Sequence, residues 1–302
     1  MRLALPVAIC LTAFVSRPCV GAETAKTAKK KKASAFKWVN PSDQWSKLPH
    51  IRHERFRSEL VKQEVGYFIL LPPSYTETPS KRYPVVYYLH GGRLGSEGKA
   101  VGLAPMILAE MKSEDVGEMI YVFVNGGPVS HYNVPDQPGV IGADVFIKEL
   151  IPHIDQTYRT IADRSGRGLE GFSQGGRGTM RLSLRHPELF SSAAAGGGGY
   201  ETERRISESG GYENEKLKFA EGDNTWDLAR KYVSSKQPRV QYMIYVGTKG
   251  FNYQNNLQYM TFLQQQGVQF ERLVVEGVPH SAKGIYAQRG REIMQFHAGN
   301  FE

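Results

Sequence analysis

Short runs of β-branched and aromatic residues recur along the chain from about residue 56 and alternate with segments of helical periodicity. Because the runs contain few polar residues, they are typical of strands that are covered on both faces. In the helical segments, apolar residues recur every three or four positions. The predicted strands are 61–71, 83–89, 119–124, 169–172, 240–246 and 270–275, and the predicted helices are 143–158, 174–185, 255–265 and 285–296.

This alternation predicts an α/β fold with an open, mostly parallel central sheet, right-handed crossovers and helices on both faces. No internal repeat interrupts the pattern, so we expect residues 36–302 to form a single domain. In such sheets the functional residues lie at the carboxyl ends of the strands, so we expect the site at those ends.

The N-terminal 22 residues have the layout of a secretory signal peptide. Arg2 precedes an apolar stretch, 3–15, that is too short to span a membrane, and small residues at 20–22 suit a cleavage site. Both cysteines, Cys10 and Cys19, lie in this segment, so we expect a mature chain without disulfides or thiol chemistry. The prediction is a secreted or periplasmic protein with no membrane span after cleavage.

The net charge of +8 is concentrated at the N-terminus, where residues 1–35 hold seven basic residues and one acidic residue. Four of these are Lys29–Lys32, within a predicted lysine-rich linker at 23–35. A nucleic-acid-binding protein carries its basic residues on a folded face. The charge pattern therefore favours a solvated linker and argues against nucleic acid as a partner.

A Gly-x-Ser-x-Gly motif, Gly171 to Gly175, follows a short predicted strand and opens a predicted helix. This context predicts a sharp strand-to-helix turn that holds the Ser173 hydroxyl above the sheet as a nucleophile. The Gln174 N–H, directly after it, would be one donor to an oxyanion. A dinucleotide site needs its glycines after a strand, but the predicted strand begins inside an overlapping Gly-x-Gly-x-x-Gly match at 166–171, so we expect no dinucleotide cofactor.

A serine hydroxyl needs a base, and the chain order in this kind of fold is serine, acid, histidine. His280 stands just past the last predicted strand and before the last helix, which is the position for that base. After the strand 83–89 comes His90-Gly91-Gly92, a loop whose backbone can approach a substrate carbonyl. The Gly92 N–H is the second predicted oxyanion donor.

At these motifs the chain resembles the "putative esterase" family of α/β-hydrolases, which includes esterase D, feruloyl and acetylxylan esterases, enterochelin esterase and the mycolyltransferases. The matching segments are 71–75, 83–91, 150–160, 171–176, 185–190 and 246–249. The resemblance covers roughly residues 55–297 and implies an α/β-hydrolase fold and a serine esterase. It is specific for the family and not for one substrate.

The resemblance also exposes a departure. The family's catalytic acid usually follows Gly-Thr-x, and this position is occupied by Gly250 in the chain. Glu170 is one candidate acid, although a buried ion pair with an arginine such as Arg181 also explains it. Further candidates are Glu201, Glu203 and, as a neutral group that orients His280, Asn252.

The sequence therefore predicts an exported serine carboxylic-ester hydrolase that removes acyl or feruloyl groups from a carbohydrate or similar ester. The alternatives are an acyltransferase or siderophore esterase of the same fold, and a catalytically weak or non-catalytic binding protein. His50 and His53 have no third ligand at a suitable spacing, so we expect no metal. The candidate acyl-pocket residues are Tyr132, Tyr200, Trp226 and Phe251, and Arg93 and Lys249 would flank the mouth.

Overall fold

The computed structural model describes residues 36–302, with the exception of residues 46, 93, 114, 136, 201–219 and 221. The predicted signal peptide and linker, and the candidates Arg93, Glu201 and Glu203, lie outside the described residues. Residues 36–302 belong to one compact unit.

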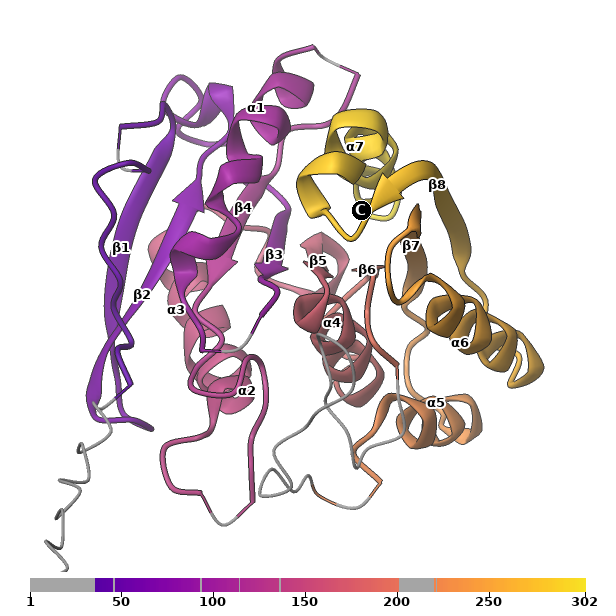
Figure 1. Cartoon of the computed structure of the whole chain (residues 1–302). Helices are drawn as coiled ribbons and strands as arrows, with labels where there is room; N and C mark the ends of the chain where they lie inside the picture. Colours follow the sequence, from indigo (N-terminus) through magenta and orange to yellow (C-terminus); the bar gives the residue numbers. More distant parts are fainter. Residues whose placement is uncertain are drawn as a thin grey trace, which may run out of the picture. The chain divides into compact units, whose positions relative to one another are not determined.

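The central sheet of the described residues has eight strands in the order β1-β2-β4-β3-β5-β6-β7-β8 (Figure 1). Strands β3 to β8 are parallel, whereas β2 pairs antiparallel with both β1 and β4. This arrangement confirms the predicted mostly parallel α/β sheet. The strands are β1 Ile51–Ser58, β2 Gln63–Leu70, β3 Val85–Leu89, β4 Ile120–Val124, β5 Arg167–Phe172, β6 Ser192–Gly196, β7 Gln241–Lys249 and β8 Glu271–Pro279.

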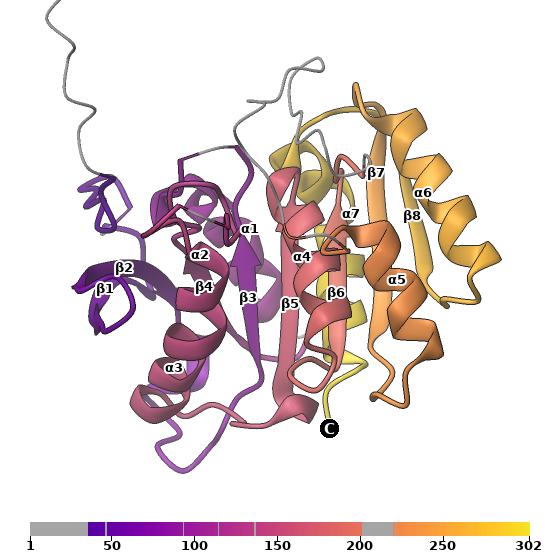
Figure 2. The ribbon, with the colours of Figure 1, turned by 90° about the horizontal axis from the view of Figure 1, so that it is seen from below.

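Helices cover both faces of the sheet (Figure 2). The α-helices are α1 Ala104–Lys112, α2 Gly142–Asp144, α3 Ile151–Thr157, α4 Gln174–Arg185, α5 Thr225–Ser234, α6 Tyr253–Gln265 and α7 Ala282–Ala298. A π-helical stretch, Val145–Leu150, joins α2 to α3, and short 3₁₀ turns lie at Pro73–Tyr75, Glu97–Lys99, Val101–Leu103 and Arg164–Gly166.

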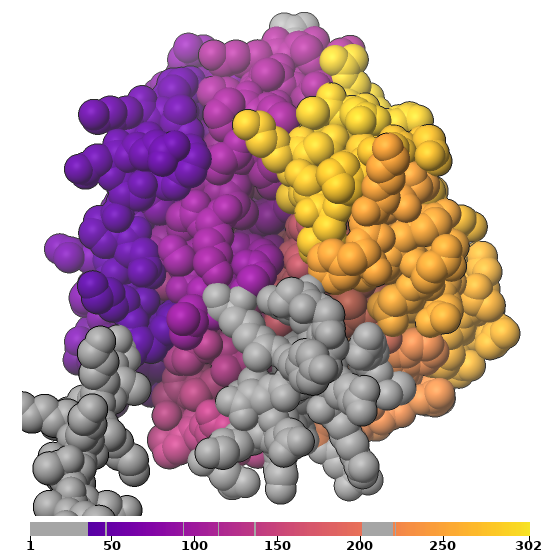
Figure 3. All heavy atoms as spheres, viewed as in Figure 1, coloured from indigo at the N-terminus to yellow at the C-terminus, as the bar shows by residue number. Residues whose placement is uncertain are grey.

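Alternation of side chains along the strands decides which helix each face meets. Tyr88 of β3 belongs to a buried cluster with Ile107 of α1 and Ile293 of α7. Its neighbour Tyr87 points the other way and contacts the Phe146 ring of the π-helical stretch, at 5.3 Å between centroids. Helices α1 and α7 therefore cover one face, and the helices from α2 to α6 cover the other. In Figure 3 the N-terminal and C-terminal parts of this unit meet on one face, and the residues of β5 and β6 between them are buried.

Several elements differ from those predicted. Strands β1 and β6 and helices α1 and α5 were not predicted, and the predicted helix 143–158 consists of α2, the π-helical stretch and α3. The last difference has a local cause, because Pro152 has no N–H to donate to an i−4 carbonyl. The predicted strand 61–71 begins only at Gln63, after a turn.

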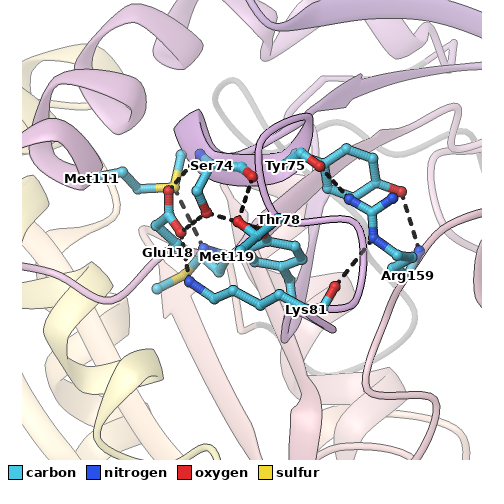
Figure 4. A network of polar contacts seen from close by, with 9 residues as sticks. Ser74, Tyr75, Thr78, Lys81, Met111, Glu118, Met119 and Arg159 are labelled. Atoms are coloured by element: carbon cyan, nitrogen blue, oxygen red, sulfur yellow. Dashed lines mark hydrogen bonds and ion pairs between the residues drawn. The ribbon is translucent and has the colours of Figure 1, made fainter.

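A polar network ties together the loops at the amino ends of β3 and β4 (Figure 4). Glu118, two residues before β4, accepts hydrogen bonds from the Ser74 N–H at 2.8 Å and from Lys81 Nζ at 2.7 Å. The Arg159 guanidinium lies over the Tyr75 ring at 3.9 Å from its centroid. These contacts stabilise the loops at the amino ends of the strands. The predicted site residues lie at the opposite, carboxyl ends.

Candidate active site

Ser173 occupies the turn between β5 and α4 in a conformation that few residues adopt, with φ 63° and ψ −118°. Such backbone strain costs on the order of 1–3 kcal/mol and recurs at functional sites. The turn is tight because α4 starts against the end of β3: a Cβ at Gly175 would lie 1.8 Å from the carbonyl oxygen of Leu89. Glycine at this position therefore allows the close approach that exposes the hydroxyl.

His280 reaches this hydroxyl from the far end of the chain. It follows β8 directly, and its Nε2 lies 2.8 Å from Ser173 Oγ. Its ring contacts the rings of Phe172 and Phe251, at centroid distances of 4.7 and 4.4 Å. Burial lowers the pKa of His280 to about 4. The imidazole is therefore neutral at pH 7 and can accept a proton through Nε2.

The His-Gly-Gly loop lies against the serine, and Gln174 directly follows it. A Cβ at Gly91 would lie 3.0 Å from Ser173 Cβ, so the His-Gly-Gly loop packs directly against it. Gly92 has a φ of 76°, which favours glycine. Gln174 is the first residue of α4, and the N–H groups of a first helical turn have no partner within the helix. The structure thus brings Ser173, His280, Gln174 and this loop together.

Glu170 is not brought to His280. Its Oε1 accepts hydrogen bonds from the hydroxyls of Tyr245 at 3.2 Å and Tyr286 at 2.7 Å, and its Oε2 lies 3.7 Å from His297 Nε2. Complete burial raises the pKa of Glu170 to about 8, so the carboxyl is protonated at neutral pH. The geometry therefore does not favour Glu170 as the acid that orients the base.

The structure does not form the alternative ion pair of Glu170 with Arg181. Arg181 Nη1 lies 3.0 Å from Asp223 Oδ2, and its guanidinium lies over the Tyr132 ring at 3.7 Å from the centroid. The buried arginine is therefore paired with the carboxylate of Asp223, which precedes α5. Glu170 is accommodated in the core as a protonated carboxyl that accepts hydrogen bonds from tyrosine hydroxyls, without a countercharge.

Asn252 lies near the base but does not bond to it. Its Nδ2 donates to the carbonyl oxygens of Gly197 and, at 3.2 Å, Gly198. Its Oδ1 and His280 Nδ1 are both buried without a hydrogen-bond partner among the described residues. A Cβ at Gly250 would lie 3.4 Å from Asn252 Oδ1 and 3.7 Å from the His280 backbone nitrogen. The position that resembles the family's acid site is thus adjacent to His280 and has no side chain.

The candidate pocket residues separate into two groups. Tyr132 and Tyr200 are buried, and Trp226 Nε1 donates to the Tyr200 carbonyl at 2.7 Å, so these three belong to the core. Phe251 is 63% exposed while it contacts the His280 ring, so it offers an aromatic surface at the site. Lys249 pairs with Pro279 in the sheet, one residue before His280.

Sequence reasoning missed Lys99, whose Nζ would lie 3.2 Å from a Cβ at Gly92. It also missed the buried side chains that hold the glycine loop, Ser130 and His131. The doubled glycine of Asn125-Gly126-Gly127 after β4 was a signal of close packing there, because a Cβ at Gly126 would lie 2.9 Å from His90 Nε2.

No group of three or more His, Cys, Asp or Glu side chains among the described residues is placed to hold a metal ion. His53 instead bonds to Glu97, at 2.9 Å. No helix in the described part of the chain has the length and apolar character needed to cross a membrane.

Comparison with known proteins identifies the family of the chain. A family model described as "Putative esterase" matches residues 58–297. The chain belongs to this esterase family. An esterase of Mycobacterium tuberculosis is 28% identical over 156 residues, which cover 50% of this chain and 32% of that protein. An endo-1,4-beta-xylanase/feruloyl esterase of Xylanibacter ruminicola is 30% identical over 152 residues, which cover 47% of this chain and 20% of that protein. The esterase-family chain thus spans only part of the length of these relatives.

Solved structures show the same fold. A ferulic acid esterase superposes with a TM-score of 0.67 at 22% identity and covers 83% of this chain and 98% of its own. The S-formylglutathione hydrolase of Staphylococcus aureus has a TM-score of 0.64 at 17% identity, with 82% and 99% covered. These structural neighbours confirm the α/β-hydrolase fold of the esterase-family chain.

Proposed function

We propose that this chain is a serine carboxylic-ester hydrolase. Ser173 attacks the ester carbonyl, and His280 Nε2 takes the hydroxyl proton and returns it to the leaving alcohol. The N–H groups of Gln174 and Gly92 stabilise the oxyanion of the tetrahedral intermediate. A water molecule that His280 deprotonates then releases the acid. The observation that carries the proposal is the 2.8 Å contact between His280 Nε2 and Ser173 Oγ at a strained turn.

The proposed substrate is an acyl or feruloyl ester of a carbohydrate, and the proposed location is outside the cytoplasm. The exposed ring of Phe251 beside His280 supports a substrate with an aromatic acyl group, because that group could form an offset or edge-on contact with the Phe251 ring. The likeness to a protein named as a xylanase and feruloyl esterase supports both parts of the proposal. The predicted signal peptide supports export.

A non-catalytic binding protein is the second candidate, and one observation favours it. His280 Nδ1 has no hydrogen-bond partner among the described residues, so no described group stabilises a charged imidazolium.

A fluorophosphonate probe separates the two candidates. The ester hydrolase is labelled at Ser173 and releases ferulate from methyl ferulate, and Ser173→Ala abolishes both. If the native chain is not labelled and Ser173→Ala equals it on 4-nitrophenyl acetate, the hydrolase proposal is wrong. Product analysis with an added sugar acceptor would reveal acyl transfer. Cell fractionation of the expressed chain tests export.

A further inference from the structure

Three consecutive backbone carbonyls of the glycine loop are each held by a buried side chain. His131 Nε2 lies 2.9 Å from the His90 carbonyl oxygen. His90 Nδ1 lies 2.8 Å from the Gly91 carbonyl oxygen, and Ser130 Oγ donates to the Gly92 carbonyl oxygen. His90, Ser130 and His131 are each at most 1% exposed. We call these three side chains the loop clamp.

The bond from His90 fixes the direction of one N–H group. The peptide bond between Gly91 and Gly92 is trans, so its C=O and its N–H point in opposite directions. Because His90 holds the Gly91 carbonyl on its own side, the Gly92 N–H is directed away from His90. The hydrogen bond from Ser130 to the Gly92 carbonyl restricts the peptide group that follows Gly92. The donor proposed for the oxyanion is thus oriented before a substrate binds.

The proton positions on the two rings follow from their partners. His90 Nε2 faces the N–H groups of Ser96 and Gly126, at 3.3 Å each, so it is an acceptor and Nδ1 carries the proton. His131 Nε2 faces a carbonyl oxygen and is therefore a donor. The two histidines thus donate through different ring nitrogens.

The clamp itself is held rigidly. His131 has a φ of 65°, a strained conformation that surrounding contacts must maintain. The carbonyl oxygen of His131 accepts a hydrogen bond from the buried Arg181 Nη2. Asn125, at the end of β4, accepts from the Gly127 N–H at 3.0 Å and donates to Glu97 at 3.0 Å. The loop after β4 is therefore anchored to both α4 and the turn after the glycine loop.

We propose that His90, Ser130 and His131 are positioning residues that aim the Gly92 N–H at the oxyanion. This inference rests on the proposed ester hydrolase. The three side chains contribute to transition-state stabilisation without contact with the substrate, because an oxyanion donor is effective only when it is preorganised.

Matched amide substitutions test the proposal, because the amide nitrogen of Asn can replace Nδ1 and that of Gln can replace Nε2. His90→Asn keeps the donor to Gly91 and His90→Gln removes it. At His131 the order is reversed, since His131→Gln keeps the donor and His131→Asn removes it. We expect the two variants without the donor to lose about 10- to 100-fold in kcat/KM relative to their matched partners, less than the loss of a whole oxyanion donor. Ser130→Ala is expected to fall in the same range, with recovery in Ser130→Thr.

Affinity for a trifluoromethyl ketone, which forms a tetrahedral adduct at the serine, is the second readout. It is expected to fall by the same factor as kcat/KM, whereas the affinity for the product acid stays constant. Thermal unfolding of each variant shows which variants fold. If a histidine variant does not fold, the Ser130→Ala and Ser130→Thr pair provides the test. Equal kcat/KM in both variants at each histidine, or parallel losses in both affinities, would overturn the inference. If the native chain neither reacts with fluorophosphonate nor turns over ester, the proposed function fails instead.

Discussion

A carboxylate placed at residue 250 tests whether His280 works without a charged partner. Gly250 has a φ outside the left-handed region, so an L-residue can adopt its backbone conformation. A Cβ there would lie 3.1 Å from the Gly247 carbonyl oxygen, which requires a shift of a few tenths of an ångström. The Gly250→Asp side chain would then start beside His280, whose backbone nitrogen lies 3.7 Å from that Cβ position.

The expected magnitude follows from the effect of a negative charge on an imidazole. A carboxylate within about 4–6 Å of a titrating group shifts its pKa by about 1–3 units. The pKa of His280, which burial lowers to about 4, is therefore expected to rise to about 5–7 in Gly250→Asp. Since one unit corresponds to about 1.4 kcal/mol, the imidazolium that forms in the transition state gains about 1.4–4 kcal/mol. This predicts an increase of about 10- to 1,000-fold in kcat/KM at pH 7.

The assay is the pH profile of kcat/KM on 4-nitrophenyl acetate, together with an NMR titration of the His280 ring. In the native chain kcat/KM should rise as the pH increases through about 4 and then level off, because the neutral imidazole is the base. In Gly250→Asp this limb should move upward by about 1–3 units. Gly250→Asn is the control, since it has the same size and no charge.

Equal profiles and equal rates in Gly250→Asp and Gly250→Asn would refute the reasoning. Such a result would mean either that the side chain does not reach His280 or that another carboxylate already supplies the charge. Glu201→Gln and Glu203→Gln separate these two explanations, because loss of activity in either would identify the existing acid.

Further predictions concern substrate and stability. Phe251→Ala should lower kcat/KM for methyl ferulate about 2- to 10-fold more than for methyl acetate, because ring contacts contribute about 0.5–1.5 kcal/mol; parallel losses on both esters would contradict this. Burial raises the pKa of Glu170 above its unfolded value, so the unfolded chain loses its proton first and the free energy of unfolding falls as the pH rises from about 4.5 to about 8. Glu170→Gln should weaken this dependence in denaturant titrations at a series of pH values; an unchanged slope would count against a protonated Glu170.

Much of the fold and the central pair of the site could be predicted from local sequence. The apolar runs of β3 and β4 identify strands covered on both faces, since all of their residues are buried. Ser173 was predictable because a sharp turn needs small flanking residues at fixed positions, and all of these positions lie within the five-residue motif. His280 followed from its place between the last strand and the last helix, and the 2.8 Å contact agrees with that prediction.

Only the tertiary structure decided the elements and partners that depend on distant segments. β6, Ser192–Gly196, is rich in alanine and has low strand propensity, and it is a strand because β5 and β7 pair with it on both sides. β1 lies at the edge of the sheet and is largely polar, so it lacks the apolar run of a buried strand.

The environments of the polar side chains were decided in the same way. Glu170 meets tyrosines that lie 75 and 116 residues away, and the clamp residues Ser130 and His131 meet carbonyls 38 and 41 residues away. Burial and hydrogen-bond geometry arise only when the chain is packed, so no local pattern could specify them.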